Sequence, residues 1–155
     1  MSFYGIEKPQ PGQAIRSSWG QKVVDALDYL YNYIKSVEAK PRMVLLASDD
    51  TEVSNTGTNE ATVKYFRFVK CDTVKLTSLH VHVEAKVSGG TGYIRIYIDG
   101  SLYKELTTQD IDYKLLEADI DISGLGNGIH KLEVRLANSG DYTTYQRLLE
   151  VYGII

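Results

Sequence analysis

Apolar residues recur at helical spacing between residues 17 and 39, and this is the clearest pattern in the chain. Steps of three and four place side chains on one face of an α-helix, and two overlapping rows of apolar positions have this spacing. The first row is Val23, Leu27, Leu30, Ile34 and Val37, and the second is Trp19, Val23, Ala26, Leu30, Tyr33 and Val37. Ser17 or Ser18 can cap the helix at its start, and Lys40-Pro41 ends it.

The apolar face of this helix is wider than a single neighbour requires. With Val24 and Tyr31 it covers about half of the helix surface, whereas a surface helix needs a stripe of about 100°. We therefore predict an amphipathic helix over residues 17–39 that packs against copies of the same chain. A helix buried deep in its own domain is the alternative. The predicted oligomer interface consists of Trp19, Val23, Leu27, Leu30, Ile34 and Val37.

Residues 1–16 precede the helix and contain Pro9, Pro11 and Gly12, which disfavour regular structure. We expect an extended N-terminal arm there.

After residue 41 the pattern changes to the alternation of β-strands. Leu79, Val81, Val83, Ala85 and Val87 point to one face, and the polar residues between them point to the other. Asp99-Gly100 is a two-residue hairpin signal. Met43 to Ala47 is a continuous apolar run, which predicts a strand buried on both faces.

About eight short strands follow one another with turn signals between them, and no helical pattern interrupts them. This excludes parallel α/β units. We predict a mainly β fold: an antiparallel jelly-roll-like β-sandwich over residues 42–155, preceded by one amphipathic α-helix.

Composition narrows the possible partners. The chain has 155 residues and a net charge of −3, with no basic run, so we expect no nucleic-acid partner. No apolar run approaches the ~20 residues that span a bilayer, and the N-terminus does not read as a secretory signal, so we expect synthesis in the cytoplasm without membrane insertion. Twelve Tyr against three Phe indicate a Tyr-rich sheet surface, which we favour over a dedicated contact surface.

The candidates for chemistry are few. Sequence motifs of hydrolases, nucleotide-binding loops and zinc proteases are absent, and the glycines between Gly124 and Gly128 join two strands. Cys71 is the single cysteine, and we expect a small core or edge residue. His80 and His82 share one face of a strand, on which Glu84 follows, and are the best metal candidates. They would need a third ligand such as His130.

Acidic residues offer two further possibilities. Paired carboxylates can hydrolyse glycosides, and an acidic loop can hold Ca²⁺, although Asp49-Asp50-Thr51-Glu52 lacks the spacing of a calcium loop. The candidate pairs are Asp110, Asp112, Asp119 and Asp121. We interpret all of them, and the histidine face, as solvated surface, with a metal at His80/His82 or at Asp49-Asp50 left open. We therefore expect no catalytic, cofactor-binding or metal residues, and a protein that is not an enzyme.

Several stretches carry a resemblance. They are Pro11 to Arg16 with Trp19 and Val23 to Leu27, Leu45 to Glu52, Thr56 to Thr58, Gly92 to Gly100, and Tyr142 to Tyr145. The first resembles the arm and helix of viral virion-surface and tail-fibre-like structural proteins, and the others resemble small β-sandwiches of phage and archaeal-virus structural proteins. The resemblance implies a capsid-decorating, turret or fibre subunit, usually a homo-oligomer and often a trimer. The chain has no long repetitive shaft, which favours a compact surface subunit.

We thus predict a non-enzymatic structural subunit of a virion or similar assembly. It would oligomerise through the helix, with a trimer favoured, and display the sandwich for host attachment or decoration. Its partners would be itself and other virion proteins or a host-surface glycan. The alternative is a carbohydrate-binding module whose exposed Tyr rings stack on sugars. A small enzyme that uses the histidine face is a third hypothesis.

Overall fold

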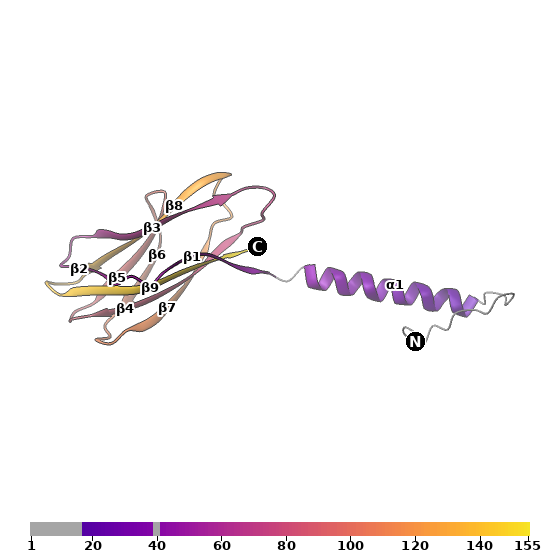
Figure 1. Ribbon diagram of the computed structural model, residues 1–155, viewed down its shortest axis with the longest axis horizontal. Helices are drawn as coiled ribbons and strands as arrows, with labels where there is room; N and C mark the ends of the chain where they lie inside the picture. The colour runs from indigo at the N-terminus through magenta and orange to yellow at the C-terminus, as the bar shows by residue number, and fades with distance from the viewer. Residues whose placement is uncertain (1–16, 39–40) are drawn as a thin grey trace. The chain divides into compact units, whose positions relative to one another are not determined.

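The computed structural model describes residues 17–38 and 41–155 (Figure 1). The chain divides into two units, Met1–Pro41 and Arg42–Ile155, and each is described by itself. The predicted extended arm, residues 1–16, lies outside the described residues, as does the predicted last helical residue, 39.

The first unit contains helix α1, Ser17–Glu38, as the apolar spacing predicts. Lys35 lies in the last turn of α1, where a cation interacts favourably with the helix dipole. The Ser36 hydroxyl donates a hydrogen bond to the Tyr33 carbonyl oxygen, 2.7 Å away.

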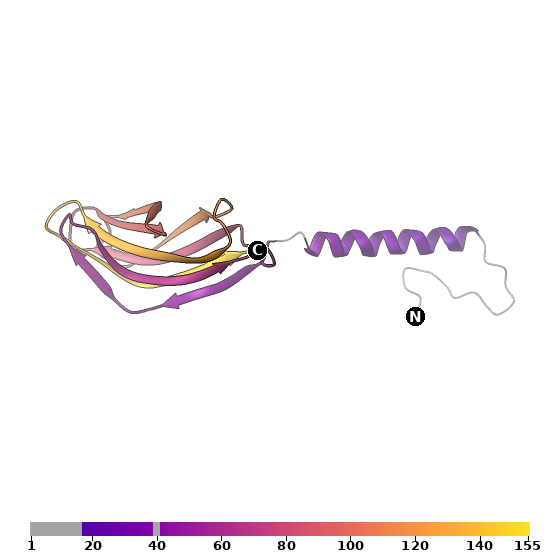
Figure 2. The same cartoon turned by 90° about the horizontal axis from the view of Figure 1, so that it is seen from above.

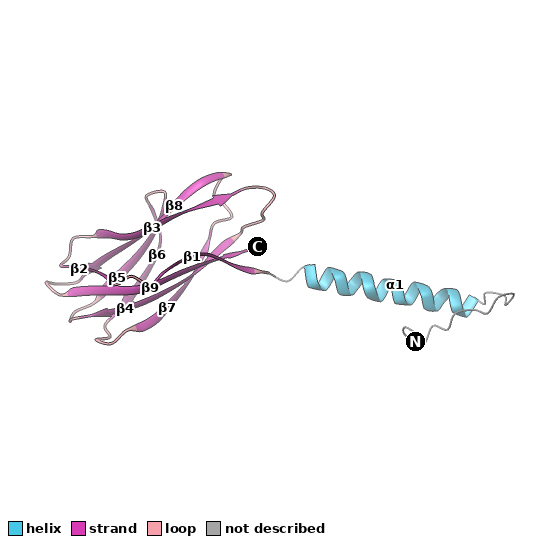
Figure 3. Cartoon of the chain, in the orientation of Figure 1, coloured by secondary structure: helices cyan, strands magenta, loops and turns pink. Residues whose placement is uncertain are grey.

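The second unit is built entirely of strands and loops among its described residues (Figure 3). Its strands are β1 (Met43–Asp49), β2 (Val53–Thr56), β3 (Ala61–Lys70), β4 (Ser78–Val87), β5 (Gly92–Ile98), β6 (Ser101–Thr108), β7 (Lys114–Asp121), β8 (Gly128–Asn138) and β9 (Thr143–Ile154). Seen from above, these strands curve along their length (Figure 2).

The strands form two antiparallel sheets. One has the order β1-β9-β4-β7, with β2 also paired to β9, and the other has the order β3-β8-β5-β6. Because β1 and β2 pair with successive parts of β9, they act as one strand interrupted at residues 50–52. If β1 and β2 are counted as one strand, the sandwich has eight strands. Their order in the two sheets is that of two interlocked Greek keys, which is a jelly roll. The predicted fold class is confirmed.

The core lies between the two sheets and follows the predicted alternation. Along β4, every second side chain is buried, beginning at Leu79, and the intervening ones lie on the outer face. β5 contributes Ile94, Ile96 and Ile98 in the same way. The hairpin between β5 and β6 is the predicted one. Asp99 and Gly100 have φ values of 50° and 82°, as a turn with two left-handed residues requires.

One expectation about the sandwich is wrong. The apolar run Met43 to Ala47 is not buried on both faces: β1 is an edge strand, and Met43 and Leu45 are 55% and 52% exposed. A continuous apolar run predicts a strand, but it does not reveal whether that strand lies inside a sheet or at its edge. Strand β2, a short strand of four residues, is one that the sequence pattern does not predict.

Candidate functional site

The predicted interface residues lie on α1, and four of them have described side chains. Leu27, Leu30 and Ile34 are 60%, 39% and 52% exposed, and Val23 is half-buried. Trp19 and Val37 belong to the helix, but their side chains lie outside the described residues. The structure thus presents large aliphatic side chains along one face of α1.

Strand β1 adds a second apolar surface. Met43, Val44 and Leu45 are exposed on it, although alternate residues of a strand point to opposite faces. Among the described strands, β1 pairs with β9 on one side and with no strand on the other. Soluble proteins usually protect edge strands with charges or short length, so an apolar edge indicates a contact surface.

The three histidines do not come together. His80 and His82 share the outer face of β4, whereas His130 lies on β8 in the other sheet. His130 Nδ1 lies 2.6 Å from Asp99 Oδ2, and its Nε2 lies 2.9 Å from the Gly126 carbonyl oxygen. The hydrogen bond to Asp99 raises the pKa of His130. The hypothesis that His130 completes a site with His80 and His82 is therefore wrong.

Glu84 also lies on the outer face of β4, where its carboxylate accepts a hydrogen bond from Arg147. Glu84 thus forms an ion pair with β9, and it is not among the residues whose ligand atoms lie close to those of the histidines.

The predicted acidic positions have separate partners. Asp110 pairs with Lys114 at 3.3 Å, Asp119 faces His80, and Asp121 accepts a hydrogen bond from the Ser123 backbone N–H. Asp49 accepts one from the Thr51 N–H, which is the main cause of its lowered pKa, and pairs with the buried Lys64. These contacts give Asp49, Asp110, Asp119 and Asp121 a partner each.

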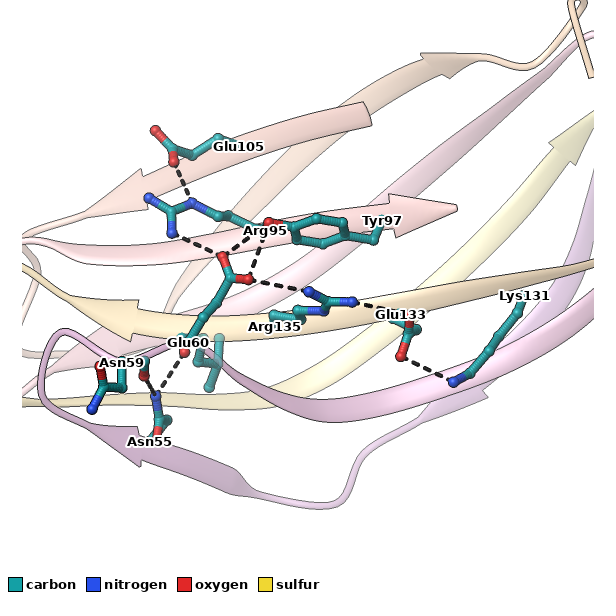
Figure 4. A network of polar contacts seen from close by, with 10 residues as sticks. Asn55, Asn59, Glu60, Arg95, Tyr97, Glu105, Lys131, Glu133 and Arg135 are labelled. Carbon is teal, nitrogen blue, oxygen red and sulfur yellow. Dashed lines mark hydrogen bonds and ion pairs between the residues drawn. The ribbon is translucent and has the colours of Figure 1, made fainter. Parts of the chain in front are cut away.

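A polar network that the sequence does not signal covers part of the outer face of the second sheet (Figure 4). Its centre is Glu60, immediately before β3. The Glu60 carboxylate accepts hydrogen bonds from Arg95 Nη1 at 2.8 Å, Arg135 Nη1 at 3.3 Å and the Tyr97 hydroxyl at 3.0 Å. The amide of Asn55 donates to the Asn59 and Leu136 carbonyl oxygens, both at 2.7 Å, and so fixes the loop that carries Glu60.

The negative charge of Glu60 compensates the repulsion between two arginines. Arg95 and Arg135 stand directly opposite each other on β5 and β8, a like-charge pairing that destabilises a sheet. The carboxylate between them compensates this repulsion. Burial raises the pKa of Glu60, but the hydrogen bonds from Arg95, Tyr97 and Arg135 outweigh it, so the pKa lies below its usual value.

The abundant tyrosines have a related role in the sheets. Arg135 lies 3.9 Å from the ring centre of Tyr97, Arg95 lies 5.0 Å from Tyr93, and Lys131 lies 5.0 Å from Tyr65. Cations within about 6 Å of a ring face are attracted to it. These tyrosines line the outer sheet face with their rings against neighbouring cations, which fits the sheet-surface interpretation.

In the described part of the chain, no helix has the length and apolar character needed to cross a membrane. No family model and no curated protein matches the sequence.

Solved structures with a similar course of the chain do exist. One is the insecticidal δ-endotoxin Cry8Ea1 of Bacillus thuringiensis (10% identity, TM-score 0.49), with 66% of this chain matched and only 19% of the toxin spanned. Another is the CBM36-1 domain of a xylanase from the hindgut metagenome of Trinervitermes trinervoides (9%, TM-score 0.46; 72% and 96% covered). A third comes from the Gx strain of infectious bursal disease virus (18%, TM-score 0.47; 76% and 32% covered).

At such low identities these likenesses concern the fold and assign no function. By its own strand order and core, the chain is a jelly-roll β-sandwich protein with an N-terminal amphipathic helix.

Proposed function

We propose that this chain is a non-enzymatic structural subunit that forms a homo-oligomer through α1 and displays its sandwich for attachment or decoration. The exposed aliphatic face of α1 carries the proposal. The resemblance of the arm, helix and sandwich stretches to viral surface proteins supports a virion as the assembly.

A second copy of the chain is the partner that fits α1 best. Most helices in proteins are stabilised by packing of their apolar face rather than by the intrinsic helix propensity of their residues. In the row Val23, Leu27, Leu30 and Ile34, steps of four and three alternate, which is the spacing of a helix-to-helix seam. Every copy carries the same row, so the surface is complementary to itself.

The width of the apolar face favours more than two copies. The second row, which includes Ala26 and Tyr33, lies beside the first and widens the face to about half of the helix surface. In a closed ring of three, each helix contacts two neighbours and so uses both rows. The exposed apolar edge of β1 supplies a further surface for contacts between copies.

Light scattering of the full chain tests the proposal, with Leu27→Asp as the variant and Asn32→Asp as the matched control. Both changes introduce the same carboxylate, but Asn32 lies on the polar side of α1. Leu27→Asp forfeits about 1.5–3 kcal/mol of apolar burial, and it adds the cost of desolvating a charge. We therefore expect at least a ~100-fold weaker association for Leu27→Asp, and an unchanged oligomer for Asn32→Asp.

Two outcomes would overturn the proposal. One is a wild-type protein that is strictly monomeric at high concentration. The other is a full-size oligomer for both Leu27→Asp and Leu30→Asp while circular dichroism shows a folded sandwich.

Carbohydrate binding, the alternative from the sequence, gains no support from the described tyrosines on the second sheet. The rings of Tyr65, Tyr93 and Tyr97 lie against cations of the same sheet. A sugar that stacked on those faces would have to displace these contacts.

A further inference from the structure

The outer face of the first sheet gathers two histidines and three carboxylates from three neighbouring strands. β4 lies between β9 and β7. The register places His80 opposite Asp119 and Tyr152, and His82 opposite Glu117 and Glu150. These six residues form two cross-strand rows on three strands and are called the His80–His82 cluster below.

The two imidazoles of the cluster meet edge to face, with their ring centres 4.7 Å apart. His80 Nε2 lies 2.9 Å from His82 Nε2, and His82 Nε2 lies 3.3 Å from a carboxylate oxygen of Glu117. One ligand atom from each of these three residues fits within 4.8 Å of the others. Zinc binds nitrogen and oxygen ligands at about 2.0–2.2 Å in tetrahedral geometry, so two ligands of one ion stand roughly 3.3–3.6 Å apart. The separation between His82 and Glu117 matches this spacing, and the shorter one between the two histidines would have to widen slightly when the ion binds.

The remaining ring nitrogens have the surroundings of metal-binding histidines. His80 Nδ1 lies 2.5 Å from Asp119 Oδ1, and His82 Nδ1 lies 3.4 Å from Glu150 Oε2. The Tyr152 hydroxyl donates a hydrogen bond to the same Glu150 oxygen, 2.9 Å away. A carboxylate that accepts the Nδ1–H of a histidine leaves the lone pair of Nε2 free for a metal, and such partners orient most metal-binding histidines.

This arrangement raises an electrostatic problem that a cation solves. When both Nδ1–H groups donate to carboxylates, both Nε2 atoms carry lone pairs, and these atoms lie 2.9 Å apart. A metal ion bound to both Nε2 atoms would relieve the repulsion between their lone pairs. Three carboxylates around the two rings favour added positive charge, and Glu117 is more than half exposed, which leaves room for water as a further ligand.

We propose that His80, His82 and Glu117 bind one divalent transition-metal ion, with Asp119 and Glu150 orienting the imidazoles. Imidazole ligands select zinc and neighbouring first-row metals, whereas Ca²⁺ and Mg²⁺ prefer oxygen ligands. The ion joins the edge strand β7 to β4, because Glu117 comes from the first and both histidines from the second.

Isothermal titration of the metal-free full chain with ZnCl₂ near neutral pH tests this site, with CaCl₂ as the comparison. We expect one Zn²⁺ per chain with micromolar or tighter affinity, and no comparable binding of Ca²⁺. His82→Ala should weaken Zn²⁺ binding by at least ~100-fold, and Asp119→Asn by about 10–100-fold.

His130→Gln is the matched control, since it removes a histidine from the other sheet and should leave the affinity unchanged. Glu117→Gln tests the third ligand with little risk to folding, because its side chain is largely exposed. We expect at least a ~10-fold loss.

The proposal fails if the wild-type protein takes up no Zn²⁺ at about 100 μM, a concentration well above the proposed affinity. It also fails if His130→Gln weakens binding as much as His82→Ala does. In the first case the cluster is only a set of polar contacts between neighbouring strands.

Discussion

Replacing Glu60 by Gln tests whether one carboxylate holds the outer face of the second sheet together. The variant keeps the size and one acceptor oxygen of the side chain but removes the charge between Arg95 and Arg135. Glu105→Gln is the matched control. Glu105 contacts the same Arg95, at 2.6 Å from its Nε, but the network in Figure 4 shows no contact from it to Arg135 or Tyr97.

The expected magnitudes differ because the surroundings differ. Glu60 is 22% exposed, and its carboxylate serves three donors, two of them charged. A hydrogen bond to a charged group contributes about 1.5–3 kcal/mol, and Gln retains part of the network, so we expect a loss of about 2–3 kcal/mol. Glu105 is 39% exposed. An exposed ion pair contributes about 0–1 kcal/mol, and we expect a loss in that range for Glu105→Gln.

Urea unfolding of the full chain, followed by circular dichroism, measures both losses. All samples must have the same protein concentration, because the unfolding of an oligomer depends on it. For Glu60→Gln we expect the midpoint to fall by about 1 M.

The pH dependence provides a second test of the same carboxylate. The pKa of Glu60 is lowered from 4.5 in the folded protein, since the bonds from Arg95, Tyr97 and Arg135 outweigh burial. A lowered folded pKa means that the stabilisation is present above the unfolded value and is lost as the pH falls through the folded one. The difference between wild type and Glu60→Gln should therefore shrink as the pH drops from about 6 to about 3. A loss no greater than that of Glu105→Gln, or a difference that does not change with pH, would refute the reasoning.

Two further predictions concern the turns and strands. Gly92→Ala should destabilise the sandwich by about 1–3 kcal/mol in thermal unfolding, because a Cβ there would lie 2.6 Å from Val87 Cγ1. Gly126→Ala, which meets open space, should change stability by less than about 0.5 kcal/mol. Asp99→Asn should cost about 1–2 kcal/mol in urea unfolding at pH ~6 and less at pH ~8. The bond to Asp99 raises the folded pKa of His130 above 6.5, so the stabilisation it gives is complete below that value and is lost as the pH rises. Equal losses at both pH values, or equal effects of the two glycine variants, would contradict these expectations.

Local patterns were sufficient to predict the elements and most of the core. The alternation from Leu79 to Val87 predicted which side of β4 is buried, because successive side chains of a strand point to opposite faces. Asp99-Gly100 predicted its hairpin for a similarly local reason, since few residues tolerate positive φ at both central positions. The spacing from Val23 to Val37 predicted α1. That its apolar face is an oligomer interface stays a prediction.

Candidate sites were harder to predict, because they depend on residues far apart in the sequence. Glu60 is 35 residues from Arg95 and 75 from Arg135, and no local signal links them. His80 and His82 could be recognised as a pair on one strand, but the sequence suggested His130 as their third partner. The strand order brought Glu117 instead.

The sequence by itself determined the helix, the strands and the buried face of most of them. Side chains repeat their direction about every 3.6 residues in a helix and every 2 residues in a strand, so the spacing of apolar residues shows which face is buried. The tertiary structure decided which strands are neighbours, and therefore that β1 is an exposed edge and that β7 and β9 flank the histidines of β4. Pairing between strands depends on the packing of the whole core, and that information is spread over all of its residues rather than carried by any one segment.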